Sequence, residues 1–243
     1  PIYIIIHIPT SYMAFKSFES FDIEMLPFFN GGDFMFLDSL AVLLTSGYTW
    51  IPLYIALILL VVKNNGKLSH IFFILLCALL CVFLSGGIDD LFVKPYFARL
   101  RPIDDPVSKH FVNEICGYRP SGYSFFSAHA ANTMSIAVFV SLLVRSRTLT
   151  ISMLLWSLTN CWTRLYLAVH YLSDVITGII WGAVVGFLVF IFFMYVYKKV
   201  TPKIVYISTQ YTSTGYKCTD VNFVLNILAL TIVVVLILVP YFN

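Results

Sequence analysis

The sequence has few charged residues. Only 11% of its 243 residues are Asp, Glu, Lys or Arg, whereas a soluble domain contains about 25%. Hydrophobic residues make up 60%, and the mean hydropathy is +0.89. A chain with so little polar side chain cannot cover a globule with it, so much of the surface must face lipid. The composition excludes most soluble domains, disordered chains and coiled coils, and it predicts an integral membrane protein.

Closely spaced cysteines and a strong excess of one charge are also missing. The five cysteines lie far apart except for Cys77 and Cys81, which fall in an apolar run without a metal-binding histidine. This spacing predicts neither a zinc site nor a disulfide framework. The net charge of +3 is too small to indicate a nucleic-acid partner. We therefore expect no metal, no cofactor and no nucleic acid.

Long apolar stretches predict about six membrane-spanning helices. A hydrocarbon layer of ~30 Å needs roughly 20 helical residues. Four stretches qualify without adjustment, and two more carry His129 or Arg164 near one end. Ionisable groups in such places are functional candidates, because burying them in lipid is costly unless they are paired or face water. The expected spans are Ser39–Val62, His70–Ile88, Ser127–Val144, Thr148–Val169, Val175–Tyr197 and Val221–Asn243.

The predicted fold class is all-α, a polytopic membrane helix bundle built from three consecutive segments. Residues 1–38 are an N-terminal segment, in which the short amphipathic stretch Phe21–Phe29 suits a helix lying in the membrane interface. Residues 39–200 are the transmembrane core, and residues 201–243 add a cytoplasmic connection and a further C-terminal span. Small residues at every fourth position of one span indicate a close helix-packing face, at Gly178, Gly182 and Gly186.

Charged residues divide unevenly between the two membrane faces. If the spans alternate in direction, one face carries a net charge of +7 and the other −4, which together give the net +3. Lys and Arg in short loops favour the cytoplasmic side. We therefore expect the basic face in the cytoplasm and the acidic face outside it. The basic face receives Lys63, Lys67, Arg145, Arg147, Lys198, Lys199, Lys203 and Lys217.

Three cations fall together on the acidic face. Lys94 and Arg101 belong to the loop that begins KPYFARLRP, and Arg164 lies in TRLYLAVHYLSD, at the end of another span. Fixed cations meeting at one point require an anion, and guanidinium groups offer the bidentate geometry that phosphate accepts. Ser127 and Ala128 stand where a helix should begin, so their backbone N–H groups would point at the same anion. The pattern predicts a phosphate-binding site.

Two histidines on this face suit different tasks. Asp174 lies four residues after His170, so it can accept a hydrogen bond from Nδ1–H and leave the Nε2 lone pair free. Such an imidazole is an activated nucleophile, although the spacing also allows a general base that activates water. His129 follows Ser127 in the first helical turn and has no adjacent carboxylate. It suits a general acid that protonates the departing oxygen.

These segments resemble the three motifs of the type 2 phosphatidic acid phosphatase superfamily, which also includes vanadium haloperoxidases and glucose 6-phosphatase. Lys94, six residues and then Arg101-Pro102 match the first motif. The second motif, Pro-Ser-Gly-His, is represented by residues 126–129, with Phe126 for Pro and Ala128 for Gly. The third motif has Thr163 in place of Ser, followed by Arg164, His170 and Asp174. The resemblance covers roughly residues 79–186.

The resemblance implies that residues 39–200 are the core of a metal-independent phosphatase. In this family the residue matching His170 forms a phosphohistidine and the residue matching His129 protonates the leaving group. The anion would be held by Lys94, Arg101, Ser127, Ala128 and Arg164. For the remaining cations on this face we expect either headgroup contacts or a more positive entrance; they are Arg99, Lys109 and Arg119.

The position at span ends favours a lipid substrate with a phosphomonoester or pyrophosphate. Undecaprenyl pyrophosphate, a lipid A phosphate, phosphatidylglycerol phosphate and phosphatidic acid are the candidates, and the first two fit a bacterial inner-membrane enzyme facing the periplasm or exterior. Two alternatives belong to other classes. A vanadate-dependent haloperoxidase would use the same anion site, but the six spans argue against it. A non-enzymatic lipid-binding protein or scramblase would not need the pair His170 and Asp174.

Overall fold

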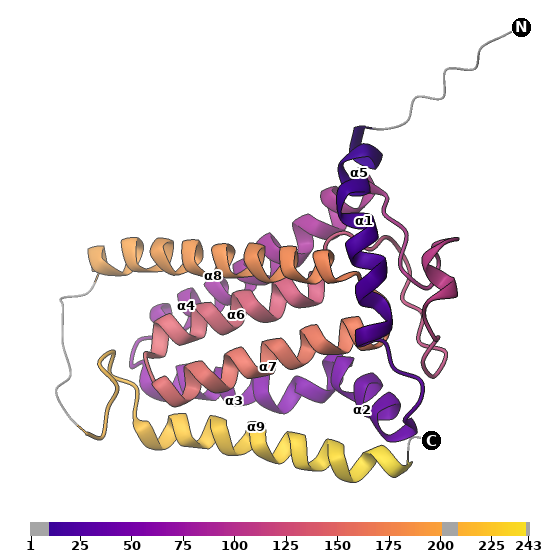
Figure 1. Cartoon of the computed structure of the whole chain (residues 1–243). Coiled ribbons are helices and arrows are strands. Elements are labelled where there is room, and N and C mark those ends of the chain that lie inside the picture. The colour runs from indigo at the N-terminus through magenta and orange to yellow at the C-terminus, as the bar shows by residue number, and fades with distance from the viewer. Residues whose placement is uncertain (1–9, 201–208, 242–243) are drawn as a thin grey trace, which may run out of the picture.

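The structure is a computed structural model that describes residues 10–200 and 209–241 (Figure 1). Within these residues the regular structure is helical, apart from one isolated β-bridge between Tyr211 and Lys217. The predicted all-α class is therefore confirmed. The predicted division into three segments stays a prediction, and residues 201–208 of the expected cytoplasmic connection lie outside the described part.

Six long helices form the bundle and run along one common direction (Figure 1). A seventh, α1 (Thr10–Phe29), lies across one end of the bundle, where α2 (Met35–Thr45) and α5 (Lys94–Phe97) are also found. The predicted helix Phe21–Phe29 is thus the second half of a longer helix. The bundle helices are α3 (Ile51–Asn64), α4 (Leu68–Val82), α6 (Ala128–Val144), α7 (Arg147–Tyr166), α8 (Leu172–Val200) and α9 (Cys218–Leu238).

Four helical stretches are long and apolar enough to cross a membrane, which agrees with an integral membrane protein. They are Gly47–Asn64, Leu68–Phe97, Leu172–Tyr197 and Cys218–Tyr241. The other two expected spans are helices as well, but α6 has only 17 residues and α7 carries buried polar side chains. Both are packed among the other bundle helices (Figure 1). The count of six is therefore approximate by length and composition.

The first two expected spans have different boundaries in the structure. Ser39–Val62 is not one helix, because Ser46 is extended (ψ 127°) and a 3₁₀ turn, Gly47–Trp50, separates α2 from α3. Pro52 stands in the first turn of α3, where its missing N–H costs nothing. The second span continues past Ile88 through two π-helical turns to Phe97. This extension carries Lys94 to the end of the bundle.

Helices α6 and α8 approach closely along the predicted glycine face. A Cβ built on Gly178 would lie 2.6 Å from the Ser127 carbonyl oxygen, and one on Gly186 would lie 2.5 Å from the Ser135 carbonyl oxygen. Gly182 would meet the backbone of Ala131 at still shorter range. Only glycine permits this contact, so the predicted packing face is confirmed. It brings the first turn of α6 against the start of α8.

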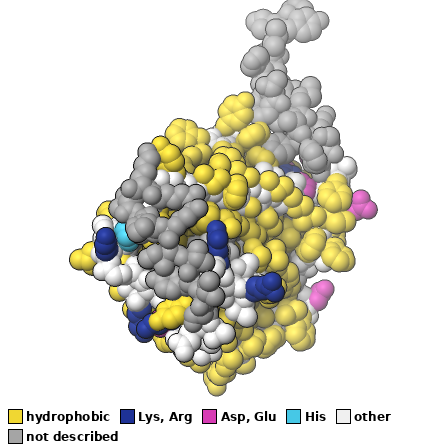
Figure 2. Space-filling view, turned by 90° about the vertical axis from the view of Figure 1, so that its left-hand side faces the viewer, with side chains coloured by type: hydrophobic (Ala, Val, Ile, Leu, Met, Phe, Trp, Pro, Cys, Tyr) yellow, Lys and Arg dark blue, Asp and Glu magenta, His cyan; other side chains and the backbone are white. Residues whose placement is uncertain are grey.

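The end of the bundle opposite α1 is the basic one. Figure 2 looks onto this end and shows Lys and Arg side chains among polar atoms, surrounded by a hydrophobic belt. Exposed apolar side chains on the bundle flanks include Phe72, Leu79 and Ile180. Such a belt between two polar ends is the expected surface of a membrane-spanning bundle. The described basic residues of this end are Lys63, Lys67, Arg145, Arg147 and Lys217.

Candidate active site

The predicted site residues meet at the bundle end that α1 crosses. The elements are the end of the Leu68–Phe97 helix, the loop after it, the first turn of α6, and the loop between α7 and α8. His129 lies near Arg164, His170, Lys94 and Arg101, close enough for these side chains to act electrostatically on its ring. The structure therefore brings the two histidines and the three cations together, over sequence separations of up to 76 residues.

His170 and Asp174 face each other but are not hydrogen-bonded. Both side chains are buried, and His170 Nδ1 lies 3.7 Å from Asp174 Oδ2, beyond the range of a hydrogen bond. Asp174 instead accepts bonds from the Tyr171 N–H (3.0 Å), the Ser124 hydroxyl and the Arg99 guanidinium (2.5 Å). Among the described residues, His170 Nδ1 has no hydrogen-bond partner. The expected Nδ1–H bond to Asp174 is therefore not present in this state.

The surroundings of His170 define its tautomer. Arg101 Nη1 lies 3.3 Å from His170 Nε2, and because a guanidinium only donates, Nε2 must accept. The ring proton then sits on Nδ1, on the side of Asp174. Burial, together with the nearby Arg164 and Arg101 charges, lowers the pKa of His170 to about 3. The imidazole is thus neutral at pH 7, with a lone pair on Nε2, as a nucleophile requires.

Arg101 holds the loops around His170. Its guanidinium donates to the carbonyl oxygens of Val169 (2.9 Å), Gly122 (3.0 Å) and Ser121 (3.1 Å), besides approaching His170. Burial and the Arg164 charge lower the pKa of Arg101 to about 10, so it stays charged at pH 7. These contacts use four of its five N–H bonds. Among the described residues, one N–H on Nη2 has no partner and is available to an anion.

Arg164 is fully buried and incompletely bonded. Its Nη1 donates to the hydroxyls of Thr45 (2.5 Å) and Tyr118 (3.1 Å), and the guanidinium carbon lies 5.5 Å from the centre of the Tyr118 ring. Its Nε–H has no partner within the described part of the chain. An unpaired buried donor on a cation is costly unless an anion completes it. Thr45 and Tyr118 had no signal in the sequence, because they lie 119 and 46 residues from Arg164.

Lys94 is already paired with acids. Its Nζ lies 2.6 Å from Asp90 and 3.3 Å from the buried Asp89. The other Asp89 oxygen accepts the N–H of Phe126 at 3.2 Å, which ties the first motif to the loop before α6. The sequence predicted Lys94 as a cation available to phosphate. In the structure its charge is compensated, so it contributes less positive charge to an anion than expected.

The start of α6 corrects one expectation. Ser127 caps the helix, its hydroxyl accepting the Ala130 N–H at 3.4 Å. Its own N–H donates to the backbone oxygen of Asp174 at 3.1 Å. The expectation that this N–H points at the anion was wrong, because it joins α6 to α8. The Ala128 N–H, at the first helical position, has no acceptor within the helix. Its predicted role as a donor to the anion stays a prediction.

Arg99 also lies elsewhere than the sequence predicted. Instead of standing at the entrance, it is bonded to Asp174 (2.5 Å), Asp22 (2.6 Å) and the Ser173 hydroxyl (2.9 Å), and its guanidinium carbon lies 3.9 Å from the centre of the Tyr171 ring. The expectation that Arg99 contacts the headgroup is therefore corrected, because its guanidinium forms ion pairs with two buried carboxylates. Asp22 comes from α1 and also accepts the Ser173 N–H at 2.9 Å. An acid on the same face of α1 as the buried Leu26 was the signal for this contact.

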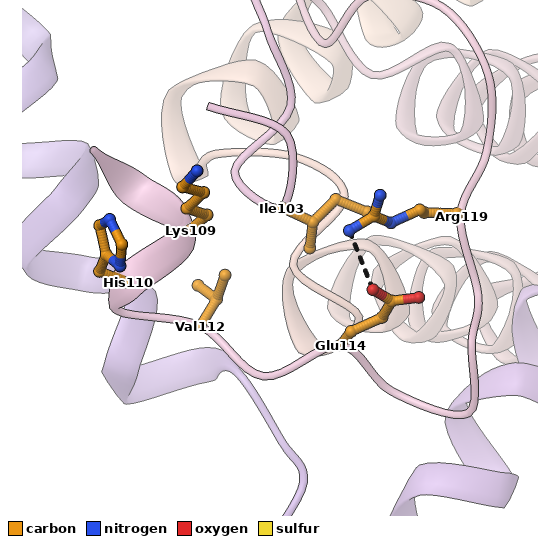
Figure 3. A pocket seen from close by; sticks show the side chains of 6 residues that line it. All are labelled: Ile103, Lys109, His110, Val112, Glu114 and Arg119. Atoms are coloured by element: carbon orange, nitrogen blue, oxygen red, sulfur yellow. Dashed lines mark ion pairs between the residues drawn. The ribbon is translucent and has the colours of Figure 1, made fainter. Parts of the chain in front are cut away.

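Lys109 and Arg119 lie outside the catalytic cluster. They line a separate pocket of about 270 Å³ in the loop between Arg101 and α6 (Figure 3). Arg119 is paired there with Glu114 at 3.0 Å and lies 3.6 Å from Asp104. Within the described ranges, no three His, Cys, Asp or Glu side chains gather where they could hold a metal ion.

The chain matches known proteins both in sequence and in fold. The PAP2 superfamily model matches residues 68–198. The chain is 33% identical over 185 residues to the lipid A 4′-phosphatase of Bacteroides thetaiotaomicron, covering 75% of this chain and 80% of that protein. It is 34% identical over 169 residues to the lipid A 4′-phosphatase of Porphyromonas gingivalis, covering 68% of this chain and 70% of that protein. A PAP2 type phosphatidylglycerolphosphate phosphatase of Bacillus subtilis shares the fold, with a TM-score of 0.58 at 18% identity over 82% of this chain and all of that one.

Proposed function

The chain belongs to the PAP2 superfamily and is a membrane-embedded phosphatase, and from this premise we propose that it removes a phosphate from a membrane lipid through a phosphohistidine on His170. The observation that carries the proposal is the state of His170. It is buried and neutral, Arg101 donates toward its Nε2 and Asp174 faces its Nδ1. Nearby, Arg164 has an Nε–H without a partner among the described residues. A lipid-binding protein or scramblase has no use for such a group.

The reaction proceeds in two balanced steps. In the first, the Nε2 lone pair of His170 attacks phosphorus while the bond from phosphorus to the lipid oxygen breaks. His129, protonated when the phosphate dianion is bound, gives its extra ring proton to that oxygen. In the second, water attacks phosphorus and passes a proton to His129, the N–P bond breaks, and inorganic phosphate leaves. Phosphorylation makes the ring cationic, and the facing Asp174 carboxylate stabilises that charge.

Charge on the equatorial phosphate oxygens would be met mainly by Arg101 and Arg164. The free N–H on Arg101 and the Nε–H of Arg164 are held in place by the bonds described above, so they need little rearrangement when charge develops. The Ala128 N–H and the start of α6 add a helix dipole. The contribution of Lys94 is smaller because Asp89 and Asp90 share its charge.

We infer that the substrate is a phosphomonoester on a saccharide lipid of the lipid A type. Two relatives more than 30% identical to the chain are named lipid A 4′-phosphatases. The elements that carry the site lie at one end of the bundle (Figure 1), where a membrane-spanning bundle meets the lipid headgroups. The basic end shown in Figure 2 supports a cytoplasmic position for that end, which would put the site at the periplasmic face of a bacterial inner membrane.

The test is a phosphate-release assay on the purified protein in detergent. The panel consists of lipid A, undecaprenyl pyrophosphate, phosphatidylglycerol phosphate and phosphatidic acid, each with and without EDTA. We expect fastest release from lipid A, no loss in EDTA, and inhibition by vanadate. A phosphoryl label that is transferred from labelled substrate to the protein, found after rapid quenching and stable in base but not in acid, would support the phosphohistidine. Full turnover without such a label would favour the general-base alternative, in which His170 activates water. Retained activity in His170→Ala would contradict both roles of His170.

The orientation has its own test. Val107 is 54% exposed, whereas the neighbouring Ser108 is buried and hydrogen-bonded to the Tyr171 hydroxyl. A thiol introduced by Val107→Cys is therefore accessible to a labelling reagent. In a background with Cys116 replaced, Val107→Cys should react with a membrane-impermeant maleimide in intact cells and Lys67→Cys should not. The opposite pattern would place the site in the cytoplasm.

A further inference from the structure

The loop between Arg101 and α6 carries a second polar pocket next to the catalytic cluster. Its walls are the side chains of Ile103, Lys109, His110, Val112, Glu114 and Arg119, with a volume of about 270 Å³. Figure 3 shows these side chains around one space, with Lys109 and Arg119 on opposite sides of Ile103. None of the six has a part in the reaction proposed above.

The pocket and the catalytic site share a boundary of packed residues. Ile103 and the part-buried Val112 pack with Leu167, Ala168 and Val169, the residues directly before His170. Ile103 is two residues from Arg101, a distance of at most about 7 Å along the chain. Arg119 directly follows Tyr118, whose hydroxyl accepts a bond from Arg164. A headgroup whose phosphate is held by Arg101 and Arg164 therefore lies beside the pocket.

The charges of the pocket favour an anion. Lys109 has no ion-pair or hydrogen-bond partner for its ammonium group among the residues the structure describes. Arg119 is paired with Glu114 and lies 3.6 Å from Asp104, but all three side chains are exposed, at 54%, 41% and 37%. Such exposed pairs contribute little, and a phosphate dianion with more oxygens competes well for the guanidinium. Ile103 and Val112 give the pocket an apolar floor, which suits the C–H face of a sugar ring.

We propose that this pocket binds a second anionic group on the headgroup of the same substrate lipid, such as a second phosphate on its saccharide. This inference rests on the proposed function and adds a specificity site to it. Lys109 and Arg119 hold the second anion, and Glu114 competes with it for Arg119. The enzyme therefore prefers a doubly charged saccharide lipid to one whose only phosphate is the one removed.

The decisive comparison uses three substrates and a small set of variants. The substrates are lipid A with phosphates at positions 1 and 4′, the same lipid with the 4′-phosphate alone, and soluble p-nitrophenyl phosphate. In the double variant Lys109→Ala/Arg119→Ala, we expect KM for the bisphosphate to rise about tenfold, with kcat unchanged. The other two substrates should keep their kcat/KM within about twofold of the wild-type value. Glu114→Gln should have the opposite sign and lower KM for the bisphosphate.

The control is Lys67→Ala, an exposed cation at the opposite end of the bundle, which should change none of these constants. A general attraction of anions would affect all three substrates alike and fade with added salt, and that result overturns the inference. Equal KM for the bisphosphate in wild type and double variant overturns it as well. Inorganic phosphate should compete only weakly, because the pocket acts on a tethered anion; strong competition at the pocket would mean a free-phosphate site instead.

Failure of the proposed function gives a different result. If the wild type hydrolysed neither lipid, binding of the bisphosphate and monophosphate lipids to His170→Ala protein would still report on the pocket. Tighter binding of the bisphosphate, lost in the triple variant with Lys109→Ala and Arg119→Ala, would support the pocket alone. Equal binding of both lipids would dismiss it.

Discussion

Charged residues at the two ends of the bundle are arranged in opposite ways. At the basic end, Lys63 is 59% exposed and lies 3.9 Å from Asp220. At the other end, Arg99 is 9% exposed and lies 2.5–2.6 Å from Asp174 and Asp22, both completely buried. Exposed pairs contribute about 0–1 kcal/mol, whereas removing one partner of a buried pair costs about 3–5 kcal/mol.

The difference shows where the fold supports chemistry. The basic end needs charge only to sit at a membrane surface, so its side chains are solvated and replaceable. The α1 end holds its charges inside the protein, where each one depends on the next: Asp22 fixes Arg99, and Arg99 fixes Asp174, which faces His170. The predictions that follow test this contrast, from its strongest point to its weakest.

The largest effect should come from the nucleophile. His170→Ala should reduce kcat by at least about 10⁴-fold, because it removes the group that attacks phosphorus. Asp174→Asn should also lose orders of magnitude, since it weakens the charge that stabilises the phosphorylated ring. Steady-state release from lipid A measures both, and a melting temperature near wild type for His170→Ala shows that the loss is chemical. Substantial turnover by His170→Ala would contradict the assignment.

The next effect should come from α1. In Asp22→Asn, Arg99 keeps only Asp174 as a carboxylate partner, and a neutral amide replaces a buried acceptor. We expect kcat to fall about 10–100-fold and the protein to lose about 3–5 kcal/mol of stability. Glu24→Gln serves as the control, because it removes an exposed acid from the same part of α1.

A purely structural role for Asp22 would lower the melting temperature but leave kcat of the remaining folded protein at the wild-type value. Measuring kcat per folded protein, well below the melting temperature, separates the two cases. An unchanged kcat would show that the Asp174 carboxylate keeps its place without α1.

The motif residues could be predicted from the sequence because each lies at a span end, where hydropathy alone marks it. Lys94, Arg101, His129, Arg164, His170 and Asp174 do converge in the structure. The spacing of four between His170 and Asp174 predicted a hydrogen bond, and the structure brings the two side chains to 3.7 Å without one. The glycine spacing correctly predicted how α6 meets α8. These features depend on local periodicity, which a sequence displays directly.

The partners of these residues could not be predicted, because they come from distant parts of the chain. Arg99 meets Asp22 across 77 residues, and Phe126 meets Asp89 across 37. Periodicity indicates that a side chain is buried but not what it touches. The same limit explains why the Ser127 N–H and the Arg99 guanidinium were assigned to substrate, while the structure uses both to join α6 and α1 to Asp174 and its neighbours.

The close contact between α6 and α8, between the two ends of the bundle, should give a smaller effect on stability and activity. In Gly182→Ala the new Cβ would meet the backbone of Ala131, which a flexible side chain cannot relieve. We expect a loss of about 1–3 kcal/mol, as for other overpacked sites, and a lower kcat because α6 carries His129. Gly47→Ala is the matched control, with no atom within 4 Å of its Cβ. Thermal unfolding in detergent compares the two, and equal melting temperatures would contradict the close contact.

Acid should destabilise the protein through the buried His170 at the α1 end of the bundle. The pKa of His170 is lowered by burial to about 3, below the value of about 6.5 in an unfolded chain. As the pH falls below about 6.5, the unfolded state takes up a proton that the folded state does not, so stability decreases, at about 1.4 kcal/mol per pH unit once well below that value. Melting temperatures of wild type and His170→Gln between about pH 8 and pH 5 test this. The wild type should lose more on acidification; parallel curves would mean that another group controls the loss.

The smallest effect should come from the basic end. Lys63 is exposed and its distance to Asp220 is at the limit for an ion pair, so solvent already screens most of the attraction. Lys63→Ala should change stability by less than about 0.5 kcal/mol and leave kcat and KM for lipid A unchanged. Topology is the remaining property it could affect, because it removes a cation from a short loop. Alone it should not invert the protein, since Lys67, Arg145 and Arg147 stay on the same face. Labelling of Val107→Cys from outside the cell should therefore be equally strong with and without the added Lys63→Ala change, and a loss of labelling would show that orientation depends on this one charge.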